Sequence, residues 1–145
     1  MAYRLHESDI LQKRPREYLG IYLDEYDTLH IRVRNGADLE NIYEELFNLL
    51  GGDFVLESSS LPSHVDAPCL ENLSASIGRK YVDLSLEKKK KLGLFAWTYD
   101  PQEDQFIVEL VNMDEEKIQL FRQWISDAEW ISFISTEALA IPKSE

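Results

Sequence analysis

Two short runs near the start of the chain, in which apolar and polar residues alternate, constrain the fold most strongly. The first is YLGIYLD, residues 18–24, and the second is TLHIRVR, residues 28–34. Alternation with a period of two is typical of a strand that buries one face, and the three residues between the runs suit a short connection. The sequence therefore predicts a β-hairpin at this place.

The outer face of this predicted hairpin is aromatic and basic if Tyr22 pairs with His30. The face would then consist of Tyr18, Tyr22, His30, Arg32 and Arg34. Such side chains can hold an anion or stack on a nucleic-acid base. Cross-strand pairs on a solvated sheet face use the same residue types, and we favour this structural interpretation.

Apolar residues recur every three or four positions in two longer stretches, which is typical of amphipathic helices. The first is ADLENIYEELFNLLGG, residues 37–52, where Asn35 or Asp38 can cap the start. The second is NMDEEKIQLFRQWISDAEW, residues 112–130, where Asn112 is expected to open a capping box.

Shorter patterns complete the predicted secondary structure, and no internal repeat is visible. Strands are expected at 54–58, 80–86, 94–99, 105–111 and 130–135. Short helices are expected around 70–77 and at 85–93. Irregular structure is expected over 1–16 and 59–72, with a frayed tail at 142–145.

These elements predict an α+β protein. A chain of 145 residues, of which 44% are hydrophobic, is long enough to bury a core within one domain. We expect a single domain spanning residues 1–145, in which two main amphipathic helices pack on an antiparallel-rich sheet.

Most motif-based chemistry is excluded. The single cysteine rules out a disulfide framework and multi-cysteine zinc sites, and the glycines form neither a dinucleotide-binding nor a phosphate-binding loop. We therefore predict no metal, no cofactor and no catalytic residues. The chain start has no apolar segment typical of a secretion signal, and no run of residues is apolar enough to cross a membrane, so we expect a cytoplasmic protein.

The loop between His64 and Cys69 is the one place where an enzyme could be built. Cys69 follows Pro68 and could lie near a helix start, which lowers a thiol pKa. A small hydrolase-like enzyme that uses His64 and Cys69 is therefore an alternative, although a catalytic pair is defined by geometry rather than by sequence distance.

Four consecutive lysines, Lys88 to Lys91, interrupt an otherwise acidic chain. Ser85 and Gly93 suit the two ends of a short helix around them. Because successive residues point in different directions around a helical turn, the lysines cannot form one flat basic face. We therefore predict a solvated helix end and no nucleic-acid site.

The charge balance is explained by solubility alone in many soluble proteins, and it also suits a basic protein partner. The chain has 27 acidic and 15 basic residues, a net charge of −12, and residues 97–145 alone account for −8. Such a field repels nucleic acid and anionic membranes and accelerates encounter with basic proteins. The predicted contact residues lie in the two hairpin loops and beside them: Asp24, Glu25, Tyr26, Asp27, Trp97, Tyr99, Asp100, Glu103 and Asp104.

In size, acidity and lack of catalytic motifs the chain resembles the immunity proteins with which bacteria neutralise basic nuclease toxins. The resemblance is one of composition, and no motif transfers residue roles. It implies a non-catalytic inhibitor of a basic protein. A regulatory or assembly subunit that acts as a homo-oligomer, for example as a homodimer through the segment Trp124 to Trp130, is the alternative.

Overall fold

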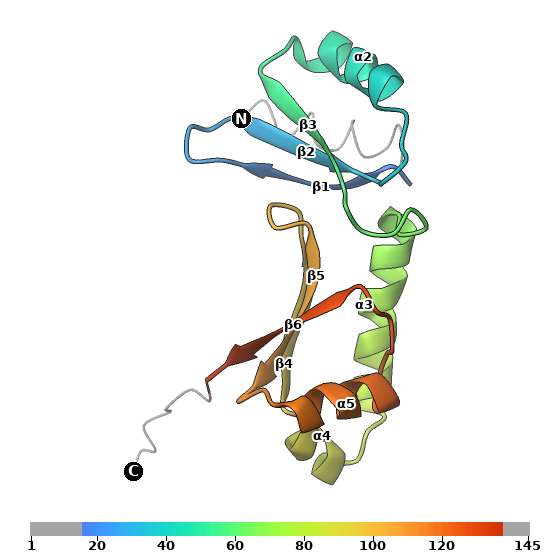
Figure 1. The fold of residues 1–145 in the computed structure, drawn as a ribbon, viewed down its shortest axis with the longest axis vertical. Helices are drawn as coiled ribbons and strands as arrows, with labels where there is room; N and C mark the ends of the chain where they lie inside the picture. Colours follow the sequence, from blue (N-terminus) through green and yellow to red (C-terminus); the bar gives the residue numbers. More distant parts are fainter. Residues whose placement is uncertain (1–15, 138–145) are drawn as a thin grey trace. The chain divides into compact units, whose positions relative to one another are not determined.

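The computed structural model describes residues 16–137, and this part of the chain forms six strands and four helices (Figure 1). Its contacts divide it into two compact units. The first unit comprises residues 16–72 and 99–105, and the second comprises residues 73–98 and 106–137. The first unit is therefore built from two separate stretches of the sequence.

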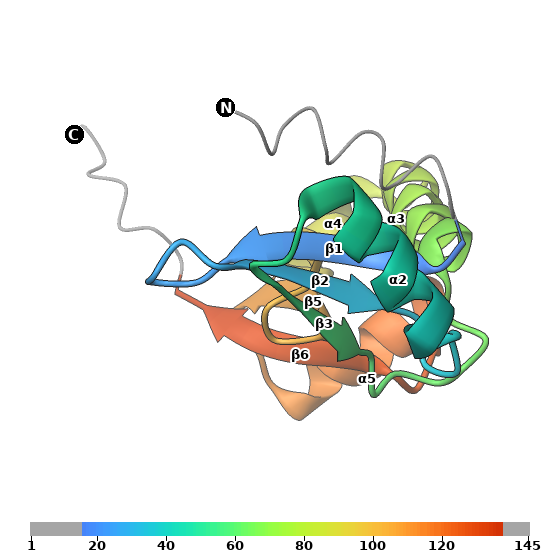
Figure 2. The same cartoon turned by 90° about the horizontal axis from the view of Figure 1, so that it is seen from above.

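The first unit contains a three-stranded sheet with the strand order β1-β2-β3. Its strands are β1 (Tyr18–Leu23), β2 (Leu29–Val33) and β3 (Phe54–Ser58). β1 and β2 are antiparallel, as expected of the hairpin, whereas β2 and β3 are parallel. Two parallel strands need a crossover, and helix α2 (Leu39–Leu50) supplies it, lying across one face of the sheet in Figure 2.

Helix α2 begins and ends where its sequence predicts. The Asp38 side chain accepts a hydrogen bond from the backbone N–H of Asn41 at 3.2 Å and so caps the first turn. Gly51 has a φ of 81°, in the left-handed region that glycine adopts readily, and its N–H donates to the carbonyl of Phe47. Both ends of the helix are thus satisfied locally.

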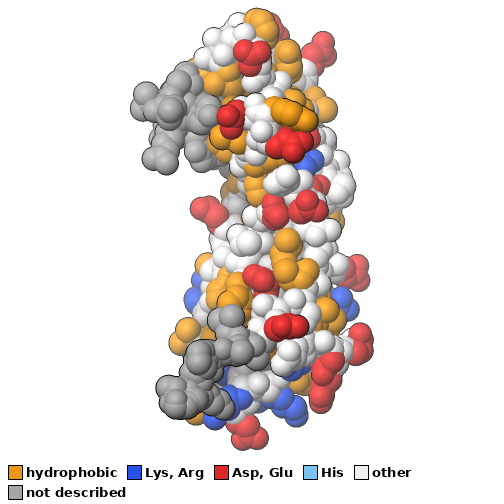
Figure 3. Space-filling view, turned by 90° about the vertical axis from the view of Figure 1, so that its left-hand side faces the viewer, with side chains coloured by type: hydrophobic (Ala, Val, Ile, Leu, Met, Phe, Trp, Pro, Cys, Tyr) orange, Lys and Arg blue, Asp and Glu red, His pale blue; other side chains and the backbone are white. Residues whose placement is uncertain are grey.

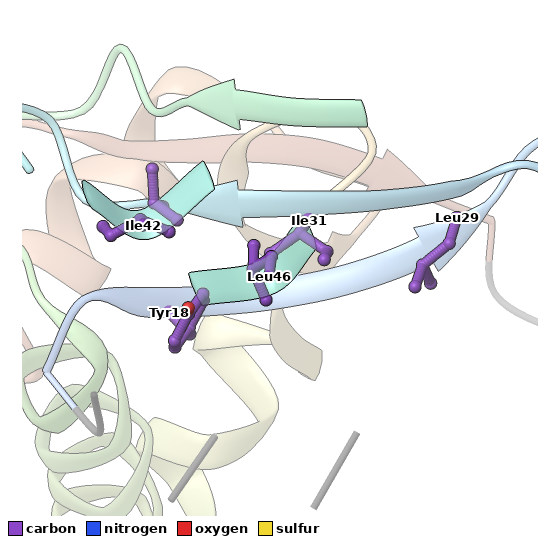
Figure 4. Packing of buried hydrophobic residues seen from close by; sticks show 6 residues of the cluster. Tyr18, Leu29, Ile31, Ile42 and Leu46 are labelled. Atoms are coloured by element: carbon purple, nitrogen blue, oxygen red, sulfur yellow. The ribbon is translucent and has the colours of Figure 1, made fainter. Parts of the chain in front are cut away.

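The core of the first unit lies between α2 and the sheet, as Figure 4 shows. It consists of Tyr18, Leu29, Ile31, Val33, Ile42 and Leu46. Alternate residues of β2 meet residues four apart on α2, which is the packing that the two periodicities predict. This burial fixes which face of the sheet points outward.

The second unit contains another three-stranded sheet, with the order β4-β5-β6. Strands β4 (Leu94–Asp100) and β5 (Gln105–Val111) form a hairpin. Helix α5 (Glu115–Trp124) then leads to β6 (Ile131–Thr136), which is parallel to β5. Both sheets therefore have a ββαβ topology with the second strand central, although the two segments show no repeat in sequence.

The central strand β5 buries alternate side chains, those of Phe106, Val108 and Leu110. Phe121 of α5 is also buried, and its ring meets that of Phe133 edge-on with the centroids 5.3 Å apart. The core of the second unit therefore includes the contact between α5 and its own sheet, and Ile77 and Leu92, from the two helices that precede β4, are buried as well.

Helix α3 (Ala67–Val82) is the main departure from the predicted secondary structure. Residues 67–72 belong to this helix rather than to an irregular stretch over 59–72. The expected strand at 80–86 is instead the end of α3 and the start of α4 (Leu86–Leu92). Both predictions are wrong at these positions.

Two local signals explain why α3 starts so early. Asp66 accepts a hydrogen bond from the backbone N–H of Cys69 at 2.9 Å and thereby caps the helix. Pro68 fits the first turn, where its missing N–H has no partner to lose. The helix also shows the apolar spacing of three and four that a strand lacks: Leu70, Leu73, Ile77 and Tyr81.

The start of α5 also differs from the prediction. Asn112 has a left-handed φ of 49° and precedes the helix, and Asp114 caps it by accepting from the backbone N–H of Lys117 at 2.8 Å. The α+β class is confirmed, but the strands form two mixed sheets. The predictions for residues 1–15 and 142–145 lie outside the described residues.

The loop between β4 and β5 belongs to the first unit and packs on the outer face of its hairpin. A Cβ atom at Gly20 of β1 would lie 2.9 Å from Cβ of Pro101, closer than real Cβ contacts allow. The proline ring is rigid and has no far end that could swing aside. Gly20 therefore permits this close approach.

We expect Gly20→Ala to lower the free energy of unfolding by about 1–3 kcal/mol through overpacking against Pro101. Gly78→Ala is the matched control. Gly78 lies inside α3, and a Cβ atom there would be 3.6 Å from the Trp97 ring, which is an ordinary contact distance. Its expected effect is a gain of up to about 1 kcal/mol from helix propensity. Urea unfolding of both variants measures the difference, and a Gly20→Ala protein as stable as the parent would contradict this packing.

Candidate functional site

The outer face of the first sheet lies between the two predicted binding loops. The register of β1 against β2 decides which side chains gather on this face. Tyr22 pairs with His30, the register from which the composition of this face was predicted, and Gly20 pairs with Arg32. The register then shifts, and Tyr18 pairs with Val33. This β-bulge turns Tyr18 into the core, where it is only 2% exposed. The prediction of Tyr18 on the outer face is therefore wrong.

The β1–β2 loop is ordered by the carboxylate of Asp24. Its Oδ1 accepts hydrogen bonds from the backbone N–H of Tyr26 at 2.8 Å and of Thr28 at 3.0 Å. Its Oδ2 lies 2.8 Å from Nε2 of His30. The bond from His30, followed by the one from Thr28, holds the pKa of Asp24 below its usual value. Asp24 thus stabilises the loop and is not free to meet a partner.

His30 lies between two carboxylates and against an aromatic ring. Its ring stacks on that of Tyr22 with centroids 4.6 Å apart, and its Nδ1 is 3.4 Å from Oε2 of Glu57. The Tyr22 hydroxyl donates to Oε1 of Glu57 at 2.7 Å. Desolvation and this bond raise the pKa of Tyr22 to about 12. Within residues 16–137, His30 therefore contacts acids and an aromatic ring rather than a nucleophile.

Arg32 ties the second loop to this face. Its Nε donates to the carbonyl of Pro101 at 3.1 Å, and its NH2 donates to that of Gln102 at 3.3 Å. The same guanidinium lies 3.5 Å from Glu57 and 4.0 Å from Asp104. The side chain is only 12% exposed, and these carbonyl and carboxylate oxygens compensate its charge inside the unit.

Asp104 is buried beneath the loop. Its carboxylate accepts hydrogen bonds from the hydroxyl of Ser59 at 2.7 Å, the backbone N–H of Ser60 at 2.6 Å and the hydroxyl of Tyr99 at 2.8 Å. Burial alone would raise the pKa of Asp104, but these bonds outweigh it, and the pKa lies below its usual value. The expected binding residues Tyr99 and Asp104 thus bond to each other.

This face does not offer cations to an anion. Arg32 is bonded to loop carbonyls, and Arg34 donates from Nε and NH2 to Glu17 at 3.0 and 3.2 Å and from NH1 to the carbonyls of Asn35 and Ser63. The outer face is therefore a network of internal ion pairs that holds two loops in place. This arrangement supports the structural interpretation of the face.

In the structure, some of the predicted binding residues bond to other groups of their own unit and the others are exposed. Asp24, Tyr99, Asp100 and Asp104 bond to other groups of the first unit, Asp100 by accepting from the backbone N–H of Gln102 at 2.9 Å. Trp97 lies in the second unit, where its Nε1–H donates to Ser74. The exposed members are Glu25, Tyr26, Asp27 and Glu103. Their contact with a partner stays a prediction.

The charge is unevenly divided between the units. The described part of the first unit holds fifteen acidic residues and three arginines, a net charge of −12. That of the second unit holds nine acidic and eight basic residues, a net charge of −1. Most of the Lys and Arg side chains visible in Figure 3 accordingly belong to the second unit.

Many acids of the first unit point into solvent without a partner. Arg16, Arg32 and Arg34 are all paired with carboxylates of the same unit, Arg16 with Asp66 at 2.9 Å. Seven exposed carboxylates form neither an ion pair nor a side-chain hydrogen bond within residues 16–137. They are Glu25, Asp27, Glu40, Glu44, Asp53, Glu71 and Glu103. Their field is therefore uncompensated at short range.

The four lysines lie on α4 in the second unit. Ser85 caps this helix by accepting from the backbone N–H of Lys88 at 3.1 Å, and Gly93 ends it with a φ of 67°, as predicted. The ammonium of Lys88 lies 5.1 Å from the Trp124 ring centroid, while Lys89 lies over a different ring. The lysines therefore point to different neighbours.

The loop from His64 to Cys69 lacks an activated thiol. Burial, followed by the charge of Asp66, raises the pKa of the Cys69 thiol, whereas a nucleophile needs a lowered one. His64 lines a surface hollow of about 330 Å³ together with Arg16 and Asp66, which bond to each other. Among residues 16–137, no group of three His, Cys, Asp or Glu side chains is placed to hold a metal ion.

Residues 69–136 match a protein family described as the Pro-like C-terminal domain. The match spans less than half of the chain and includes the second ββαβ segment. No curated protein matches the chain. None of the helices within residues 16–137 is long and apolar enough to span a bilayer.

The bonds of Asp104 predict a specific loss of stability in acid. Because its pKa is lowered in the folded state, its contribution is present above about pH 4 and is lost as the pH falls through the folded-state pKa. We expect Asp104→Asn to lower the free energy of unfolding at pH 7 by about 1–3 kcal/mol and to make its decline in acid shallower.

Asp53→Asn is the control for this experiment. Asp53 shares the left-handed φ of Asp104, 49° against 56°, but is exposed. Asparagine tolerates this conformation, so neither change strains the backbone. Urea unfolding between pH 3 and pH 7, at intervals of about one unit, compares the two variants. Equal effects of both substitutions would show that Asp104 does not stabilise the loop.

Proposed function

We propose that this protein is a non-catalytic, acidic binding module that works in the cytoplasm and inhibits a basic protein partner, such as a bacterial nuclease toxin. The observation that supports this most directly is the charge of the first unit. Its described residues have a net charge of −12, all three of its arginines are internally paired, and seven exposed acids are left for a partner.

The physical benefit of this arrangement is in association. An uncompensated negative surface attracts a basic protein over about 8–10 Å at physiological salt and raises the rate of encounter. The internal bonds of Asp24 and Asp104 hold the β1–β2 and β4–β5 loops in fixed conformations before binding. Less ordering entropy is then lost when the complex forms.

The β1–β2 loop is a favourable contact point within the first unit. The Tyr26 side chain is 80% exposed and stands between Glu25 and Asp27, two of the unpaired acids. Tyrosine is enriched among the residues that dominate binding energies, and acids around it would meet cations of the partner. We assign Tyr26 as the aromatic anchor of this loop.

The two alternatives have less support. A homo-oligomer that associates through the segment Trp124 to Trp130 would use the second unit and would leave the exposed acids of the first unit without a role. A hydrolase that uses Cys69 would need a thiolate, but the pKa of this thiol is raised.

Affinity capture from the native lysate, followed by binding kinetics of the purified partner, tests the proposed function. We expect one basic protein bound at equal stoichiometry, with an association rate that falls as salt rises. Glu25→Lys with Glu103→Lys should slow association about tenfold or more, because two exposed acids of the first unit become basic.

Asp127→Lys with Glu129→Lys is the matched control, since it changes the net charge equally from exposed positions of the second unit. This control should slow association by clearly less. Equal slowing by both pairs would show a diffuse effect of net charge rather than a first-unit site. Absence of any stoichiometric basic partner would contradict the proposed function itself.

A further inference from the structure

Helix α2 leaves a row of apolar side chains exposed that the core does not use. Leu39, Tyr43 and Phe47 follow one another at intervals of four residues, so they form one strip along the helix. Their side chains are 42%, 47% and 48% exposed. In Figure 2 no other described helix or strand lies over the outward side of α2.

This strip is not the buried side of the helix. Ile42 and Leu46 point into the core and are 0% and 1% exposed. The strip lies on the neighbouring shoulder of α2 and continues onto the start of β3, where the ring of Phe54 lies 5.0 Å from that of Tyr43. The Tyr43 and Phe47 rings are 6.2 Å apart. The result is a small aromatic surface beside an edge strand.

Acids border this surface on one side. Glu40 and Glu44 each follow a residue of the strip, so both stand about 100° further round the helix. Neither forms an ion pair or a side-chain hydrogen bond within residues 16–137. Apolar surface with unpaired carboxylates along its rim matches the composition of many interfaces, in which a hydrophobic centre is surrounded by a polar rim.

We infer that the strip formed by Leu39, Tyr43 and Phe47 is a docking surface for an amphipathic, basic segment of a protein partner. Apolar side chains of the partner cover the strip, and its lysines or arginines meet Glu40 and Glu44. A second copy of this chain fits less well, because the same acids would face each other across a symmetric interface.

The second unit offers no equivalent surface among its described residues. Its most exposed large apolar side chains are those of Val82, Leu86 and Phe95, at 69%, 68% and 54%. The described part of the second unit also has a net charge of only −1, against −12 for that of the first unit. Charge complementarity with a basic segment therefore selects α2.

The inference deepens the proposed function, but it can be tested without knowing the natural partner. The probe is a synthetic amphipathic peptide of leucine and lysine, compared with a peptide in which glutamate replaces every lysine. Each is added to the full-length protein, and backbone amide NMR shifts locate the bound peptide. We expect the basic peptide to shift the amides of α2 and of the start of β3, and the acidic peptide to shift none of them.

Variants separate the apolar contribution from the charge. Tyr43→Gln and Phe47→Gln should each weaken binding of the basic peptide about tenfold, and Glu40→Lys with Glu44→Lys should do the same. Phe95→Gln, which changes an equally exposed phenylalanine of the second unit, should leave binding unchanged. Thermal unfolding checks that each variant is folded, and the exposed Glu40 and Glu44 are substitutions that leave the core untouched.

The possible results are distinct. Shifts spread over the acidic loops, no binding, or equal weakening by Phe95→Gln would overturn the docking surface. Concentration-dependent shifts of α2 without any peptide would overturn it in favour of a second copy. Binding at α2 together with no basic partner in the lysate would support the surface while contradicting the inhibitor function. A captured basic partner, together with no peptide bound at α2, would support the inhibitor function while overturning the docking surface.

Discussion

The hydrogen bonds of the buried Asp104 carboxylate decide how the first unit is put together. They join the loop between β4 and β5 to Ser59 and Ser60 at the end of β3, while Arg32 binds two carbonyls of the same loop. A buried carboxylate is costly unless its oxygens are satisfied, and here donors from three residues satisfy it. Without these bonds the loop would have no reason to pack against Gly20, and residues 99–105 would not belong to the first unit.

The same chemistry leaves a surface of one sign. Among the described residues of the first unit, each arginine is bonded to a carboxylate or a carbonyl, so these cations contribute to folding rather than to ligand binding. The remaining acids are exposed on loops and helices around an aromatic strip and a protruding tyrosine. Internal pairing and external acidity are thus two consequences of one imbalance, fifteen acids against three arginines among the described residues of this unit.

Local periodicity predicted what depends on neighbouring residues. It placed α2 with its cap Asp38, the pairing of Tyr22 with His30, and the short helix between Ser85 and Gly93. It missed what depends on distant contacts or on a single inserted residue. The bulge turns Tyr18 from the outer face of the sheet into the core, although the alternation of apolar and polar residues in the sequence continues unchanged. The burial of Asp104 depends on hydrogen bonds from serines more than forty positions away. The charge of the first unit was equally hidden, because three of its acids come from the second hairpin.

We propose that the first unit is the surface that meets a basic protein. Hydrogen exchange of the backbone amides, measured for the free protein and for its complex with the captured partner, tests it most directly. We expect slower exchange in the β1–β2 loop and in α2, with residues 73–98 and 106–137 little changed. Protection confined to those second-unit residues, with exchange of the first unit unaltered, would contradict it.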